Sequence, residues 1–197
     1  ILGIVRRNMK NPMQLFRIFY WNYCHKAIHS NLPEGRYVNV LSHCAMDIAK
    51  TAYVEIGGLV SFNQKRTRGS KGEFRLLVED GAKLTFGKGH SYFKYDSDVQ
   101  VFKGAQLLIG RCSTNIGLKI VCAEKIVIGN DVHIGRDVWI RDNNGGHYVI
   151  IKGYKDKAPV IIGDNVWICS NVSITKGVTI GEGAIISSNS VVTTNIP

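Results

Sequence analysis

Residues 162–192 read IGDNVWICSNVSITKGVTIGEGAIISSNSVV, and this stretch decides the fold. An aliphatic residue opens a new unit every six positions, at Ile162, Ile168, Ile174, Ile180, Ile186 and Val192. A small or β-branched residue holds the fifth position of each unit, at Val166, Val172, Val178, Ala184 and Ser190. A period of six matches neither the 3.6 residues of an α-helix turn nor the simple alternation of a β-strand. It predicts a chain that turns a corner after every short strand.

Three such units would close a triangular coil of 18 residues, as from Ile162 to Ile180. Glycine, asparagine or aspartate would make each corner, because these residues tolerate turn conformations. Coils would stack at about 4.8 Å, the spacing of neighbouring strands, and their aliphatic positions would bury one continuous core. An earlier run, opened by Ile128, Ile134 and Ile140, has the same period. We therefore expect an all-β protein built as a parallel β-helix.

The pattern [Ile/Val/Leu]-Gly-x-x-[small]-x resembles that of the hexapeptide-repeat acyltransferase superfamily. The resemblance is clear over residues 99–197 and less regular from about Val54. Within the superfamily the chain is most similar to sugar and polysaccharide O-acetyltransferases of the capsule, colanic-acid and maltose/galactoside acetyltransferase type. The resemblance implies a left-handed coil, a homotrimer with active sites where chains meet, and acetyl-CoA as the acyl donor.

The first 45 residues carry no repeat. The segment 9–30 is aromatic and basic, and we expect a helix in it after Pro12. We therefore divide the chain into a helical N-terminal segment, residues 1–45, and a β-helix domain, residues 46–197. The helix would either cap the open end of the β-helix, which otherwise exposes an unpaired edge, or lie in a bilayer surface through residues such as Phe16 and Trp21. Because the chain begins without Met, we expect that its true N-terminus is missing. Members of the superfamily usually add a short tail after the position of Pro197, so we also expect disorder or truncation at the C-terminal end.

The composition is that of a soluble globular protein, with 45% hydrophobic and 20% charged residues. The five cysteines form no C-x-x-C pair, which predicts free thiols and a cytoplasmic protein. If the N-terminal helix lies in a bilayer surface, the protein would also contact the inner face of the membrane peripherally. The net charge of +10 is spread along the chain. With no nucleic-acid recognition module in view, it favours a polyanionic small ligand such as coenzyme A over nucleic acid.

The six-residue register breaks between Ile140 and Ile162, where 22 residues replace the 18 of one coil. A polar loop, residues 141–159, should protrude there, and loops on rigid scaffolds often carry function. The resemblance assigns the catalytic base to His147, which precedes a Pro-Val-x-Ile-Gly run. An imidazole is suited to removing a hydroxyl proton at neutral pH. Asp142 would orient this imidazole or bind acceptor hydroxyls, or else it only makes a corner.

The resemblance also implies binding residues. His133, Asn143 and Asn144 would contact the acceptor, although His133 could equally face solvent. Coenzyme A would lie in a groove between adjacent chains, along Trp167, Cys169, Ser170, Lys176, Ser187 and Ser188. Trp167 would pack on the pantetheine arm or on a neighbouring chain, and Lys176 would meet phosphate oxygens. Family members usually have glycine or alanine at the position of Cys169, so the resemblance does not fix which residues of this groove contact coenzyme A.

These features predict O-acetyl transfer from acetyl-CoA to a hydroxyl of a sugar or polysaccharide precursor. The alternatives are an N-acetyltransferase acting on an amino sugar, a xenobiotic acetyltransferase, and a non-enzymatic scaffold that recruits partners. Zinc-dependent carbonic anhydrases of this fold need three histidines. Because no histidine follows His147, we expect no metal site.

Overall fold

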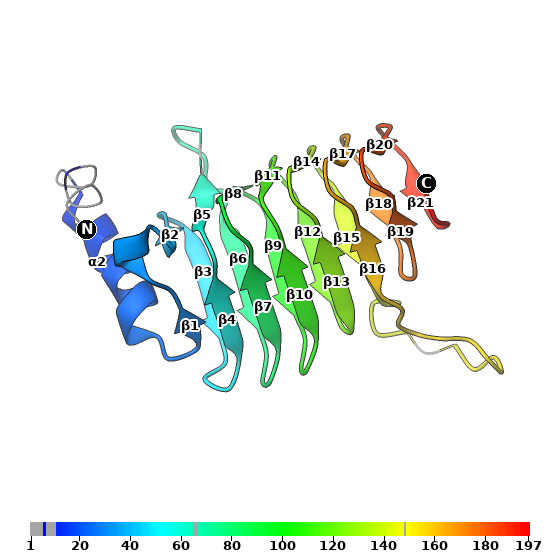
Figure 1. The fold of residues 1–197 in the computed structure, drawn as a ribbon, viewed down its shortest axis with the longest axis horizontal. Coiled ribbons are helices and arrows are strands. Elements are labelled where there is room, and N and C mark those ends of the chain that lie inside the picture. The colour runs from blue at the N-terminus through cyan, green and yellow to red at the C-terminus, as the bar shows by residue number, and fades with distance from the viewer. Residues whose placement is uncertain (1–5, 7–10, 65–66, 148) are drawn as a thin grey trace.

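The computed structural model describes residue 6 and residues 11–64, 67–147 and 149–197. In these ranges the chain forms three parallel sheets of seven short strands each (Figure 1). Sheet A consists of β1 (Ile28–His29), β4 (Tyr53–Ile56), β7 (Lys83–Phe86), β10 (Gln106–Ile109), β13 (Lys125–Ile128), β16 (Val160–Ile162) and β19 (Thr179–Ile180). Sheet B consists of β2 (Tyr37–Val40), β5 (Leu59–Gln64), β8 (His90–Lys94), β11 (Cys112–Thr114), β14 (Val132–Ile134), β17 (Trp167–Ile168) and β20 (Ile185–Ile186). Sheet C consists of β3 (Cys44–Ile48), β6 (Phe74–Val78), β9 (Asp98–Val101), β12 (Lys119–Cys122), β15 (Trp139–Arg141), β18 (Ser173–Ile174) and β21 (Val191–Val192).

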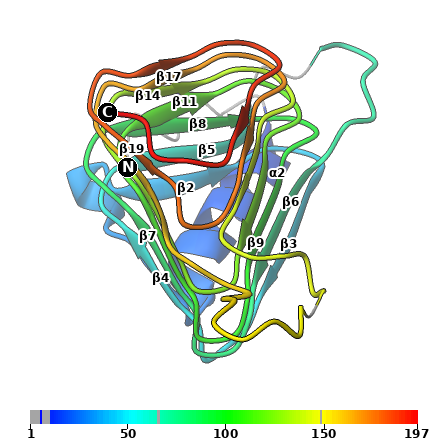
Figure 2. The same cartoon turned by 90° about the vertical axis from the view of Figure 1, so that its right-hand side faces the viewer.

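The chain visits sheets A, B and C in turn, so hydrogen-bonded neighbours in each sheet are three strands apart in sequence. Viewed along the long axis, the sheets form the sides of a triangular prism (Figure 2). The predicted parallel β-helix is therefore confirmed.

The last coils have the predicted register. Ile161 pairs with Thr179 and Trp167 with Ile185, an 18-residue coil in both cases. The aliphatic residues that open the hexads, together with Val166, Val172 and Val178, are at most 6% exposed. Ala184 is half-buried. Both inward positions of the hexad thus face the core, as expected from the spacing.

The corners use the fourth position of each hexad. Asn165, Asn171 and Asn189 have φ angles of 58°, 58° and 63° there. This left-handed conformation is disfavoured for most L-residues, and asparagine accepts it because its short amide bonds locally. Asn171 Nδ2 donates to Asn189 Oδ1 on the next coil at 2.7 Å, so the corner residues also connect successive coils.

The upstream coils are longer, which explains their looser repeat. Val54 pairs with Leu84, thirty residues later. Four phenylalanines fill the wider interior, with ring centroids 4.5 to 5.9 Å apart: Phe62, Phe74, Phe86 and Phe93. Large rings replace the aliphatic ladder where the coil encloses more space.

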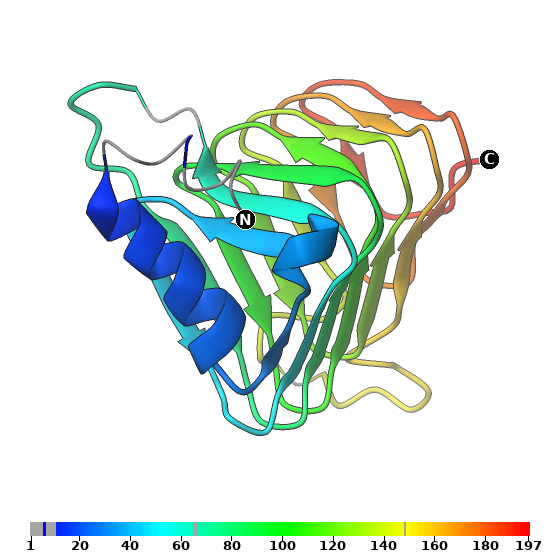
Figure 3. The ribbon, with the colours of Figure 1, turned by 60° about the vertical axis from the view of Figure 1, so that its left-hand side comes forward.

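Helix α2 (Pro12–Phe19) begins at Pro12, as predicted, and continues into a π-helical turn, Tyr20–Cys24. It lies at the open N-terminal end of the β-helix (Figures 1 and 3). A 3₁₀ turn, Leu32–Glu34, follows β1. The first coil begins at Ile28 and β3 runs through residue 45. The β-helix therefore starts earlier than the boundary expected at residue 46.

Polar side chains of this helical segment bond to β2, the edge strand of sheet B. Gln14 Nε2 donates to Val40 O at 2.9 Å. Asn22 Nδ2 donates to Val38 O, and Val38 N donates to Asn22 Oδ1, both at 2.8 Å. These bonds occupy backbone groups that a strand edge leaves unpaired. Within the described ranges, no helix has the length and apolar character needed to cross a membrane.

Substitution of Gly135 would test how closely the coils stack. A Cβ at this position would lie 2.6 Å from the carbonyl carbon of Cys169 on the next coil. We expect Gly135→Ala to lower the free energy of unfolding by about 1–3 kcal/mol, the usual cost of overpacking, as measured by urea denaturation. Thr193→Ala, on an exposed residue, should change it by less than about 0.5 kcal/mol. Equal urea midpoints for Gly135→Ala and the original chain would contradict this packing.

Candidate functional site

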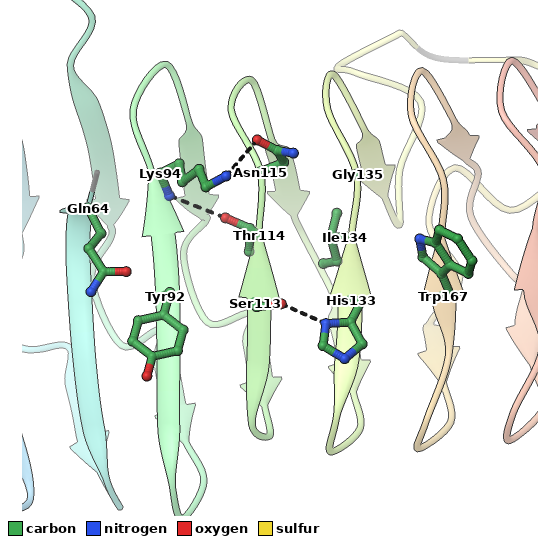
Figure 4. Close-up of a pocket in the computed structure, with 10 residues that line it drawn as sticks. All are labelled: Gln64, Tyr92, Lys94, Ser113, Thr114, Asn115, His133, Ile134, Gly135 and Trp167. Atoms are coloured by element: carbon green, nitrogen blue, oxygen red, sulfur yellow. Dashed lines mark hydrogen bonds between the residues drawn. The ribbon is translucent and has the colours of Figure 1, made fainter. Parts of the chain in front are cut away.

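A groove of about 460 Å³ runs along the outer face of sheet B (Figure 4). It crosses β5, β8, β11, β14 and β17. Its walls are formed by Gln64, Tyr92, Lys94, Ser113, Thr114, Asn115, His133, Ile134, Gly135 and Trp167. Outward-facing side chains of consecutive coils make most of this surface, and the buried Thr114 and Ile134 border it.

One row of the groove is set by strand register. Ser113 pairs with Tyr92 and with His133, and His133 pairs with Trp167. The Ser113 hydroxyl and His133 Nδ1 are 2.7 Å apart and hydrogen-bonded. Trp167 is 53% exposed. The row thus places a hydroxyl and an imidazole between two aromatic side chains, and we name it the Tyr92–Trp167 row.

A cationic group lies beside this row. Lys94 Nζ donates to Asn115 Oδ1 at 3.0 Å, and Lys94 N donates to Thr114 Oγ1 at 3.3 Å (Figure 4). The groove therefore combines aromatic faces, neutral hydrogen-bonding groups and one positive charge. Such a surface is suited to a polar ligand with apolar faces.

His147 lies elsewhere, in the segment between β15 and β16. This segment, residues 142–147 and 149–159, protrudes from the corner between sheets C and A, opposite sheet B (Figure 2), and we call it the His147 loop. His147 is exposed there. A single chain therefore does not bring His147 together with His133 or Trp167.

Asn143 and Asn144 hold this loop in shape. Asn143 Nδ2 donates to Val121 O at 3.0 Å, and its Oδ1 accepts from Gly145 N at 2.7 Å. Asn144 bonds through both ends of its amide, to Asp156 Oδ1 at 3.0 Å and to the Tyr154 hydroxyl at 3.2 Å. Their predicted contact with an acceptor stays a prediction, and the observed bonds give both a structural role.

Asp142 is fully buried beneath the same loop. Its carboxylate accepts hydrogen bonds from the backbone N–H groups of Ala123 and Glu124, both at 2.7 Å. The Cys122 thiol lies 3.6 Å from Oδ2, and burial, followed by the charge of Asp142, raises the pKa of that thiol. Both carboxylate oxygens accept hydrogen bonds from the neighbouring coil. This favours the interpretation that Asp142 makes a corner over the interpretation that it orients His147.

The residues expected to bind coenzyme A divide between two corners. Cys169 and Ser170 follow β17, and Ser187 and Ser188 follow β20 directly above them, at the corner between sheets B and C. Lys176 follows β18, at the corner between sheets C and A. Its Nζ lies 4.3 Å from the ring centroid of Tyr154 in the His147 loop. Trp167 thus lines the groove, the four small residues lie at the corner that follows it, and Lys176 lies beside the His147 loop.

Sequence reasoning missed Tyr92, Lys94 and Ser113. No constant spacing connects them to His133, because the upstream coils differ in length, and only the strand pairing aligns them. Among the residues that the structure describes, no three His, Cys, Asp or Glu side chains form a group able to hold a metal ion.

Asp142→Asn separates a structural from a catalytic carboxylate. The amide offers one oxygen to two backbone donors, so one buried N–H loses its partner. We expect the free energy of unfolding to fall by about 1.5–3 kcal/mol, the usual value for hydrogen bonds to charged groups, as measured in urea. Glu182→Gln, at an exposed corner, is the control. If Asp142→Asn is as stable as the original chain, a structural role of Asp142 is contradicted and only a role in binding or catalysis remains.

Comparison with known proteins identifies a family match in the repeat region. Residues 159–194 match the bacterial transferase hexapeptide family, as six repeats. A hexapeptide-repeat acetyltransferase from Vibrio cholerae O1 biovar eltor, solved with acetyl-coenzyme A, is 30% identical, over 46% of this chain and 51% of its own, with a TM-score of 0.41. The chain thus spans about half the length of that protein. The polySia-specific acetyltransferase NeuO is 23% identical, over 87% of this chain and 80% of its own, with a TM-score of 0.47. No match was found among curated proteins. Residues 159–194 are therefore hexapeptide repeats of the bacterial transferase type.

Proposed function

We propose that this protein transfers an acetyl group from acetyl-CoA to a hydroxyl of a sugar or polysaccharide precursor, with His147 as the general base. The observation that carries the proposal is the position of His147. It stands on the loop that interrupts the transferase-type repeats, next to the matched residues 159–194. A reactive side chain on a loop held by a rigid scaffold is the usual arrangement for catalysis.

The proposed reaction is a direct acyl transfer. His147 takes the proton from the acceptor hydroxyl as its oxygen attacks the thioester carbonyl. The tetrahedral intermediate then collapses, the carbon–sulfur bond breaks, and the proton passes from His147 to the departing thiolate. The products are the acetyl ester and coenzyme A.

The groove on sheet B supports a sugar as the acceptor. The Tyr92 and Trp167 rings can stack on the apolar faces of sugar rings, while Ser113, His133 and Asn115 can bond to hydroxyl groups. The row runs along the axis of the β-helix, so an extended chain of sugars could follow it. We therefore assign the acceptor to the groove, with His133 as a binding residue.

A homotrimer would complete this site. Sheet B, which carries the groove, and the loop that carries His147 lie on opposite sides of the prism (Figure 2). The groove of one chain therefore needs the His147 loop of another. The same loop exposes apolar side chains, with Ile150 fully exposed and Ile151 64% exposed in the single chain. Contact with a neighbouring copy would cover them.

The first test concerns His147. With acetyl-CoA and a panel of neutral and amino sugars as acceptors, His147→Ala should lower turnover by about 10²–10⁴, the usual contribution of a positioned base. Unfolding should be unchanged, because His147 is exposed. His133→Ala should mainly raise KM for the acceptor, and the exposed His29→Ala on β1 should match the original chain. Near-normal turnover of His147→Ala with the best acceptor would contradict the assignment, and acetylation of amines alone would indicate N-acetyl transfer.

The second test concerns the shared site. Sedimentation equilibrium should give three times the 21.9 kDa of one chain. His147→Ala and Trp167→Ala chains should each be impaired alone. Co-expressed, they should recover roughly one quarter of the sites, because a ring of mixed chains regenerates some intact pairs. A monomer mass, or no recovery in mixed trimers, would contradict a site shared between chains.

A further inference from the structure

The helical segment 12–24 differs from an ordinary surface helix, which buries its apolar face. Its buried side is mixed, with Ile18 at 1% exposure beside polar residues. Its polar Gln14 and Asn22 are buried against the edge of sheet B, at 3% and 6% exposure. Its outward side is apolar instead. That side, which we call the outer aromatic face, is 38–65% exposed and consists of Met13, Phe16, Phe19, Tyr20 and Tyr23.

These rings form one continuous surface. Phe16 stacks on Tyr20 with 6.3 Å between centroids, and Phe19 stacks on Tyr23 at 5.7 Å. Both pairs have the four-residue spacing that places side chains on one side of a helix. The helix lies at the N-terminal end of the prism, away from the His147 loop (Figures 1 and 3). Capping the β-helix therefore accounts for the buried polar side and leaves the outer aromatic face without a role.

The charged residues of the segment that carries this face have one sign. Residues 1–33 contain no Asp or Glu, and their basic residues are Arg6, Arg7, Lys10, Arg17 and Lys26. Arg17 lies within α2, and Lys26 follows the π-helical turn and is exposed. Aromatic side chains with flanking cations and no acid are complementary to an anionic lipid surface, where rings enter the interface and cations meet headgroups.

We propose that the outer aromatic face docks the protein on an anionic lipid bilayer. Helix α2 lies parallel to the membrane, with its rings at the headgroup boundary and its polar side still bonded to β2. The long axis of the β-helix then points away from the bilayer, and the groove and the His147 loop remain accessible. This inference is independent of the proposed acetyl transfer, and its test needs no activity.

The test is sedimentation of the full chain with large unilamellar vesicles. Vesicles of equal parts phosphatidylcholine and phosphatidylglycerol should bind the protein, and vesicles of phosphatidylcholine alone should bind it at least about tenfold more weakly. Phe16→Ser/Tyr20→Ser should lower binding to the mixed vesicles by about tenfold or more. Val191→Ser, an exposed apolar residue at the opposite end, should leave binding unchanged.

A charge series separates lipid attraction from general basicity. Arg17→Gln/Lys26→Gln should weaken binding to the mixed vesicles by about 30-fold, because each cation at an anionic surface contributes about fivefold. Lys83→Gln/Lys125→Gln removes the same charge from exposed positions on sheet A and should have little effect. Unchanged melting temperatures will establish that all variants are folded.

Three outcomes would overturn the proposal. One is no binding of the original chain to the mixed vesicles. Another is equal binding by Phe16→Ser/Tyr20→Ser, which would leave the rings without a role. The third is self-association that this variant abolishes, which would assign the outer aromatic face to a second copy of the chain.

Discussion

The structure depends on the hydrogen bonding of every strand to the strands one coil below and one coil above. Such pairing fixes which side chains face inward, because a shift of one residue would turn each of them to the opposite face. In the last coils the inward positions are filled by Ile, Val or smaller residues, and the Ile and Val residues among them are at most 6% exposed. In these coils extra residues are therefore tolerated at corners. Ile126 pairs with Val160 across a coil that contains the whole His147 loop, yet the strands on either side keep their register.

The same pairing leaves an open edge at each end of the prism, and the two ends are treated differently. At the C-terminal end the chain itself returns, with Gly181 N donating to Ile196 O at 2.9 Å. At the N-terminal end the side chains of Gln14 and Asn22 form hydrogen bonds with the backbone of β2. Gln14, Ile18 and Asn22 therefore occupy the buried side of this helical segment, and its aromatic residues lie on the outer side. The outer aromatic face thus follows from how the first coil is closed.

The fold was readable from the sequence where one hexad resembles the next. Residues 162–192 predicted the inward positions, the corners and the 18-residue coil, and Pro12 predicted the start of α2. The first coils were not readable in this way, because their lengths vary and phenylalanines such as Phe62 and Phe74 fill them. The break in register located the protruding loop, but the roles assigned to Asp142, Asn143 and Asn144 depended on what lies beside them. The partners of Asp142, at Ala123 and Glu124, are set by which coil lies next to it, and no local motif encodes that neighbour.

The separation of the groove from the His147 loop is a consequence of the triangular section. A side and the corner opposite to it cannot approach each other, since the packed core lies between them and the loop is tied to its own corner by Asn143 and Asn144. Chemistry that needs both must therefore join two chains. If a corner of one prism meets a side of the next, the contact is heterologous, and a threefold rotation between neighbours would close it into a ring. A three-sided coil presents one such corner and one such side per chain, so the proposed trimer would contain three equivalent sites, with every groove and every loop used once.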